Sequence, residues 1–167
     1  MGLKDEGSKF MFKINDYVKY KNDVCVISNI KEIRGFNYYT LAPIQDTSLT
    51  VNLPVDTNLV KPLIGYDDAI KMIDDLPNLS VINMTNDKAL EQSYRKLLLS
   101  DETIDLFTIV KTAFLRNKKR NDSGRKLGSV DSHYYEEANK KLLLELSIVM
   151  HLDEDKIENI LIEQITK

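Results

Sequence analysis

The 167-residue sequence has few of the residues that build covalent or metal frameworks. It contains one cysteine, Cys25, no tryptophan, six glycines and four prolines. A single cysteine excludes an internal disulfide and any zinc or iron–sulfur site built from several cysteines. No segment approaches the roughly 18 apolar residues of a membrane-spanning helix, and the N-terminus has no apolar stretch typical of a signal peptide. We therefore expect a cytoplasmic protein with no membrane partner.

The sequence also lacks a strong charge of either sign. Lysine and arginine number 23 and aspartate and glutamate 26, which gives a formal net charge of −3. Attraction of the whole chain to nucleic acid is therefore excluded. Any nucleic-acid binding has to come from a local cluster of basic residues.

The common catalytic motifs are absent as well. The sequence has no glycine-rich phosphate loop, no Gly-x-Ser-x-Gly motif and no His-Glu-x-x-His motif. Its two histidines, His133 and His151, have no neighbouring cysteine, and adjacent acidic pairs such as Asp67-Asp68 are typical of solvated helix surfaces. We expect no enzyme activity, no catalytic residues, no cofactor, no metal and no small-molecule substrate.

Short runs of β-branched and aromatic residues dominate residues 12 to 63 and predict strands. The runs are Val18 with Tyr20, Val24 to Ile27, Tyr38 to Leu41, and Leu49 to Leu53. Turn-forming residues separate them at Asn22-Asp23, at Arg34-Gly35 and at Asp46 to Ser48. This pattern predicts a small, strongly bent sheet or barrel.

After Pro62 the apolar spacing becomes helical. The first expected helix runs from Tyr66 to Leu76, and the second from a cap at Asn86 or Asp87 to about Leu99. The third begins at Ser100 or Asp101 and reaches the segment Arg116 to Arg120. The fourth begins at Ser129 or Asp131 and includes Val149, and the fifth follows an N-cap at Asp153. The sequence thus predicts an α+β multidomain protein, in which a small β-module precedes an all-α domain of about five helices.

Three segments follow from this pattern. Residues 1–10 are expected to be a disordered native tail or an extension added by cloning, since Met11 would make a natural first residue. Residues 11–63 form the predicted β-domain. Residues 66–167 form the predicted helical domain.

Two segments of the β-domain carry recognisable motifs. The first is Phe12 to Tyr20, and the second is the aromatic run Tyr38 to Pro43 followed by Leu49 to Asp56, which contains a Thr-Val-x-hydrophobic-Pro motif. The first segment resembles the opening strand of CarD-family transcription regulators, and the second resembles that family's aromatic strand and the motif after it. The same β-module occurs in the polymerase-interacting domain of transcription-repair coupling factors. In the helical half, Tyr94 to Asp101 resembles the CarD helix junction, so the resemblance covers about residues 11 to 150.

The resemblance implies a Tudor-like β-module that binds the β subunit of bacterial RNA polymerase through an exposed strand. Asn52 stands where many relatives carry arginine, so backbone pairing is expected to carry more of the affinity. Carried over to this chain, the polymerase-binding residues are Thr50, Val51, Asn52, Leu53 and Pro54.

The resemblance further implies that the helical domain binds promoter DNA at the upstream edge of the open bubble and modulates open-complex stability. Some family members insert a tryptophan into the minor groove there. This chain has no tryptophan, and the aligned position falls near Asn86, which cannot unstack bases as a large apolar ring does.

A cluster of basic residues between positions 111 and 126 predicts DNA binding independently of the resemblance, because lysine and arginine neutralise phosphates. Asp122 is the single acidic residue in this segment. The alternative is a solvated helix end, where basic residues are also favoured. The predicted DNA-binding residues are Asn86, Lys88, Arg95, Lys111, Arg116, Lys118, Lys119, Arg120, Arg125 and Lys126.

Two functional hypotheses remain open from the sequence. The first is a regulator that joins RNA polymerase to promoter DNA. The second is a protein-interaction adaptor that uses the β-module and binds no DNA. A salt titration separates them, because phosphate contacts make affinity fall steeply as salt rises.

Overall fold

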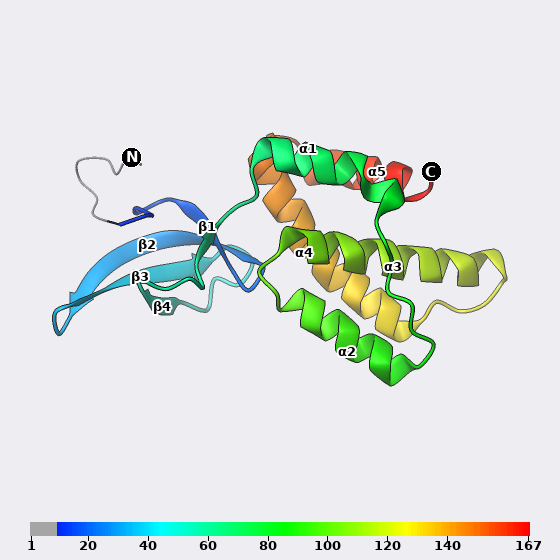
Figure 1. The fold of residues 1–167 in the computed structure, drawn as a ribbon, viewed down its shortest axis with the longest axis horizontal. Helices are drawn as coiled ribbons and strands as arrows, with labels where there is room; N and C mark the ends of the chain where they lie inside the picture. Colours follow the sequence, from blue (N-terminus) through cyan, green and yellow to red (C-terminus); the bar gives the residue numbers. More distant parts are fainter. Residues whose placement is uncertain (1–9) are drawn as a thin grey trace. The chain divides into compact units, whose positions relative to one another are not determined.

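The computed structural model describes residues 10–167, which form two compact units that divide between Leu63 and Ile64 (Figure 1). The first unit holds an antiparallel five-stranded sheet and the second holds five α-helices. This confirms the predicted α+β architecture. The predicted tail lies outside the described residues except for Phe10, which packs against the core of the first unit.

The sheet has the strand order β4-β3-β2-β1-β5 and is open, with β4 and β5 as its edges. A closed barrel is therefore not observed. The strands are β1 (Tyr17–Tyr20), β2 (Asp23–Ile33), β3 (Phe36–Pro43), β4 (Val51–Pro54) and β5 (Lys61–Pro62).

Two tight turns explain why the first three strands form consecutive hairpins. Lys21 and Asn22 join β1 to β2 with φ angles of 51° and 66°, one residue earlier than the predicted turn. Arg34 and Gly35 join β2 to β3 with φ angles of 54° and 83°, as predicted. Two successive residues with positive φ form the turn whose twist matches that of antiparallel strands.

The sheet buries one face over an apolar core of its own. Val18, Cys25, Ile27, Tyr39 and Leu41 are at most 1 % exposed there. The register of β2 against β3 shifts between Ile27 and Asn29, which marks a β-bulge. A bulge increases local bending, in agreement with the predicted bent sheet.

The second unit contains helices close to the predicted ranges. They are α1 (Tyr66–Asp74), a 3₁₀ turn (Leu76–Asn78), α2 (Asp87–Leu98), α3 (Thr103–Asp122), α4 (Ser129–Met150) and α5 (Glu154–Ile165). Asn86 caps α2, since its side-chain oxygen accepts hydrogen bonds from the backbone N–H groups of Lys88 and Ala89. Glu102, rather than Ser100 or Asp101, is the N-cap of α3. Asp153 is the N-cap of α5 but makes no side-chain capping hydrogen bond.

Helices α3 and α4 form the centre of this unit, and the first part of α3 is buried on nearly all sides. The start of α2, the end of α3 and the start of α4 lie at the same end of the unit (Figure 1). No helix within residues 10–167 is long and apolar enough to cross a membrane.

Candidate interaction surfaces

Strand β4 leaves one edge of the sheet open, and its register shows which backbone groups face outward. The N–H of Val55 donates to the C=O of Asn37 at 3.1 Å, so these opposite residues form a hydrogen-bonded pair. Hydrogen-bonded and non-bonded pairs alternate along an antiparallel ladder. Asn52, which lies opposite Thr40, therefore belongs to a non-bonded pair. Its N–H and C=O point away from β3, toward the open edge.

The side chains of β4 alternate between the core and the outer face of the sheet. Val51 and Leu53 pack against the β-core, whereas Asn52 and Pro54 are exposed. The hydroxyl of Thr40 donates to Oδ1 of Asn52 at 2.8 Å, which fixes the amide on the outer face. Thr50, the remaining residue of the predicted set, is exposed and precedes the strand.

The outer face beside β4 carries exposed apolar side chains. Pairing places Pro54 opposite Tyr38, and Ile33 opposite Phe36, and the period of two puts all four on one face. Phe36 is 68 % exposed and Ile33 is 44 % exposed. We call Ile33, Phe36, Tyr38 and Pro54 the outer-face patch. Exposed apolar groups gathered beside an open strand edge are typical of protein-binding surfaces.

Lys111 belongs to the predicted DNA-binding set, but the structure places it away from the exposed basic residues. The residue is 5 % exposed. Its ammonium group donates to three backbone carbonyls, those of Leu76, Pro77 and Leu79, at 2.7 to 3.0 Å. Burial lowers the pKa of this amine. Lys111 therefore ties the end of the 3₁₀ turn to α3.

Arg116 and Arg120 converge on Asp131 in the first turn of α4. Asp131 is 1 % exposed. Nε of Arg116 contacts both carboxylate oxygens at 3.1 Å, and one terminal nitrogen of Arg120 contacts Oδ2 at 2.6 Å. The hydroxyl of Tyr94 donates to Oδ1 at 2.6 Å. Burial and this carboxylate together raise the pKa of Tyr94, so the tyrosine remains a donor.

The sequence signalled Asp131 only as a possible helix start, because its partners lie 11 to 37 residues away. A carboxylate with two arginines and a tyrosine connects α2, α3 and α4. Arg116 and Arg120 keep 28 % and 21 % of their side-chain surface exposed. A terminal nitrogen of Arg116 also donates to the C=O of Met84 at 3.5 Å, so both guanidinium groups are held largely by the protein itself.

The loop after α3 is closed by a helix-ending motif and by Asn117. The N–H of Arg125 donates to the C=O of Arg120, and that of Gly124, with a φ of 70°, donates to the C=O of Asn121. These two bonds define a Schellman motif. Oδ1 of Asn117 then accepts from both the Gly128 N–H and the Arg120 guanidinium at 2.8 Å.

Four other predicted basic residues near the end of α3 are exposed. Lys118 forms an ion pair with Asp122 at 3.0 Å. Within residues 10–167, the side chains of Lys119, Arg125 and Lys126 have no ion-pair or hydrogen-bond partner. We call these last three residues the exposed basic group.

The predicted DNA-binding residues of α2 do not all lie near the end of α3. Lys88 lies in the first turn, at the same end of the unit as the end of α3 (Figure 1). Arg95 lies in the last turn, seven residues or about 10 Å farther along the helix axis. The side-chain oxygen of Asn86 is occupied in capping the helix.

Comparisons with known proteins provide no relative on which to base a function. No protein-family model matches the chain, and no curated protein matches it. The β4 edge and the exposed basic group are therefore the features from which a function is inferred.

Proposed function

We propose that this protein is a transcription regulator whose β-domain, a Tudor-like module, binds the β subunit of bacterial RNA polymerase and whose helical domain binds promoter DNA. The observation that carries the proposal is the open edge of β4, where the backbone of Asn52 faces outward beside the outer-face patch. This edge belongs to the segment that resembles the polymerase-binding strand of CarD-family regulators.

Strand addition suits this edge because it supplies backbone hydrogen bonds, while neighbouring side chains give specificity. Asn52 offers both an N–H and a C=O, whereas Pro54 has no N–H to donate. Pairing is therefore confined to a short segment. The outer-face patch provides the apolar contact that so few hydrogen bonds need for a stable complex.

Phosphate contacts are the second part of the proposal. The exposed basic group lies in the last turn of α3 and in the loop that follows it, and the end of α3 lies at the same end of the helical unit as the start of α2 (Figure 1). Cations in such an arrangement bind DNA by counterion release without reading sequence. Because Asn86 is occupied as a helix cap, we expect bubble stabilisation to come from phosphate contacts rather than from an inserted side chain.

The β4 geometry gives a sharp test with purified RNA polymerase. Asn52→Pro removes the outward N–H, whereas Asn52→Ala keeps it and removes only the side-chain amide. Losing one backbone hydrogen bond of about 1 to 1.5 kcal/mol weakens binding about tenfold. We expect that loss in the proline variant and a much smaller one in the alanine variant, measured by biolayer interferometry.

Folding is checked by the thermal transition of each variant. Val51 belongs to a hydrogen-bonded pair with β3, so Val51→Pro breaks the sheet itself and serves as the unfolding reference. Equal polymerase affinity of folded Asn52→Pro and wild type would overturn the assignment of the β4 edge.

The second candidate function is an adaptor that binds a protein partner but no DNA. Two observations favour it. The ammonium group of Lys111 binds backbone carbonyls inside the protein, and Arg116 and Arg120 form ion pairs with Asp131, so these three residues offer less positive charge to DNA. Affinity for DNA at low salt decides between the two functions.

A further inference from the structure

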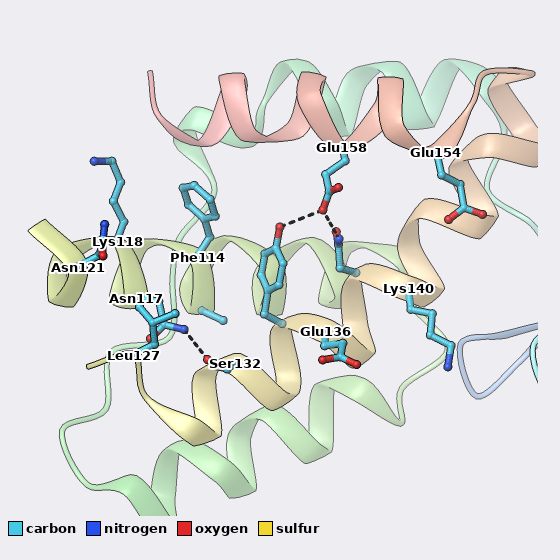
Figure 2. Close-up of a pocket in the computed structure, with 13 residues that line it drawn as sticks. Phe114, Asn117, Lys118, Asn121, Leu127, Ser132, Glu136, Lys140, Glu154 and Glu158 are labelled. Atoms are coloured by element: carbon cyan, nitrogen blue, oxygen red, sulfur yellow. Dashed lines mark hydrogen bonds between the residues drawn. The ribbon is translucent and has the colours of Figure 1, made fainter. Parts of the chain in front are cut away.

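A groove of about 890 Å³ lies between α3, α4 and α5 (Figure 2). One side is apolar, formed by Ala113 and Phe114 of α3, Leu127 of the following loop and Tyr135 of α4. The rings of Phe114 and Tyr135 lie 6.3 Å apart with a tilt of 40° and form one continuous aromatic wall. A groove of this volume is large enough for a small organic molecule.

The polar side of the groove offers acceptors. Asn139 is only 8 % exposed, and its Nδ2 donates to the carboxylate of Glu158 at 2.7 Å. Its Oδ1 is buried and has no hydrogen-bond partner within residues 10–167. A buried polar atom without a partner is costly, so a hydrogen-bond donor beside this oxygen, from water or from a bound molecule, would be stabilising.

Tyr135 joins the same carboxylate. Its hydroxyl donates to Glu158 at 3.4 Å, as the dashed lines around Glu158 show (Figure 2). Burial and the neighbouring Glu158 raise the pKa of Tyr135 to about 12, so the phenol keeps its proton at neutral pH. Asn139 and Tyr135 are thus the two protein donors to Glu158, and its carboxylate can accept further hydrogen bonds from a ligand.

The charges around the groove are predominantly negative. Glu136, Glu154 and Glu158 line it together with Lys118 and Lys140. The charge of Lys118 is balanced by Asp122, which is not among the lining residues. A site with excess carboxylates, a buried carbonyl oxygen and aromatic rings is complementary to a cation that donates hydrogen bonds.

We propose that this groove binds a small organic ammonium ion. The apolar body of the ligand lies on Phe114 and Tyr135, and its ammonium group donates to Glu158 and to Oδ1 of Asn139. This proposal does not rest on the proposed function, although Lys118, Asn121 and Leu127, which line one end of the groove, are neighbours of the exposed basic group in the sequence.

The test uses 2-phenylethylammonium, the neutral 2-phenylethanol and the anion phenylacetate as probes with the full chain, followed by NMR titration and calorimetry. We expect millimolar binding of the ammonium ion, with at least tenfold weaker binding of the alcohol and none of the anion. Equal affinity for the ammonium ion and the alcohol, or no binding of the ammonium ion, overturns the proposal.

Two matched variants locate the site. Glu158→Gln removes the carboxylate in the groove, and Glu163→Gln makes the same charge change at an exposed position of α5 that does not line it. We expect Glu158→Gln to weaken ammonium binding at least tenfold and Glu163→Gln to leave it unchanged. Equal effects of the two variants contradict the assignment. If Glu158→Gln does not fold, the ligand series on the wild-type chain still decides.

Discussion

Lys111 and Lys118 stand seven residues apart on the same side of α3, yet they have opposite roles. Lys111 is buried and holds three carbonyls of the segment Leu76 to Leu79. The side chain of Lys118 is 46 % exposed and forms an ion pair with the exposed Asp122. The difference arises because other segments cover the first part of α3 and leave its end uncovered. Position along a central helix, rather than helical phase, decides what a basic residue does.

Arg116 and Arg120 lie between these extremes. Each gives part of its guanidinium to the buried Asp131 and keeps part of its surface exposed. The exposure of the basic side chains therefore increases along this segment, from the buried Lys111 through the partly exposed arginines to the exposed basic group. The following variants test this order by comparing a substitution at a covered position with a matched substitution at an uncovered one.

The largest effect is expected at Asp131. Asp131→Ala leaves two arginines and the Tyr94 hydroxyl without their common acceptor, and removing one partner of a buried charge pair costs about 3 kcal/mol or more. Asp122→Ala removes the exposed partner of Lys118 and should cost about 0.5 kcal/mol or less. Urea unfolding measures both values. Similar losses in the two variants would contradict the distinction between covered and uncovered pairs.

The next effect concerns the two lysines themselves. Lys111→Met removes the donor for three carbonyls in a buried place, which should lower the free energy of unfolding by about 2 kcal/mol. Lys118→Met should change it by about 0.5 kcal/mol or less. Thermal and urea denaturation of the pair test this contrast. A Lys111→Met protein as stable as wild type would show that the carbonyls find water instead.

A smaller effect is expected at Gly128, where the chain approaches Arg120 closely. A Cβ at this glycine would clash with a terminal nitrogen of Arg120, which Asp131 and Asn117 hold in place. Gly128→Ala should therefore cost about 1 kcal/mol. Gly65→Ala is the control, since its Cβ would meet Asp68 at an ordinary 3.7 Å.

A double-mutant cycle checks the cause of that loss. If the clash with Arg120 is responsible, Arg120→Ala should remove most of the additional cost of Gly128→Ala. Strict additivity of the two substitutions would mean that the alanine acts through some other contact.

Local patterns in the sequence were sufficient for much of the fold. The strand predicted in residues 49 to 53, observed as Val51–Pro54, and the capping residue Asn86 depend on neighbouring residues, so their structural roles could be predicted. β5 was missed because two residues, Lys61 and Pro62, carry no periodicity. The closed barrel was one of two predicted forms, and only the bent open sheet is observed.

The sites were harder to predict because they depend on distant partners. Lys111 was predicted to bind DNA because it lies in a segment rich in basic residues. Only the packing of residues 76 to 79 against α3 shows that its ammonium group is hydrogen-bonded to backbone carbonyls. Asp131 gave no distinctive signal, since its role requires α2, α3 and α4 to meet. The exposed basic group, by contrast, lies in and just after the last turns of α3, where the local sequence is informative.

The salt dependence of binding to duplex DNA tests the central claim most directly, namely that the uncovered end of α3 is a DNA surface. The test variant changes Lys119, Arg125 and Lys126 to glutamine, and the control changes three exposed lysines elsewhere, Lys71, Lys156 and Lys167. Each lost phosphate contact reduces the logarithmic salt slope by roughly 0.9, so the test variant should lose nearly 3 units and the control almost none. Equal slopes for the two variants, or no DNA affinity of the wild type at low salt, would contradict the DNA-binding function and favour the adaptor.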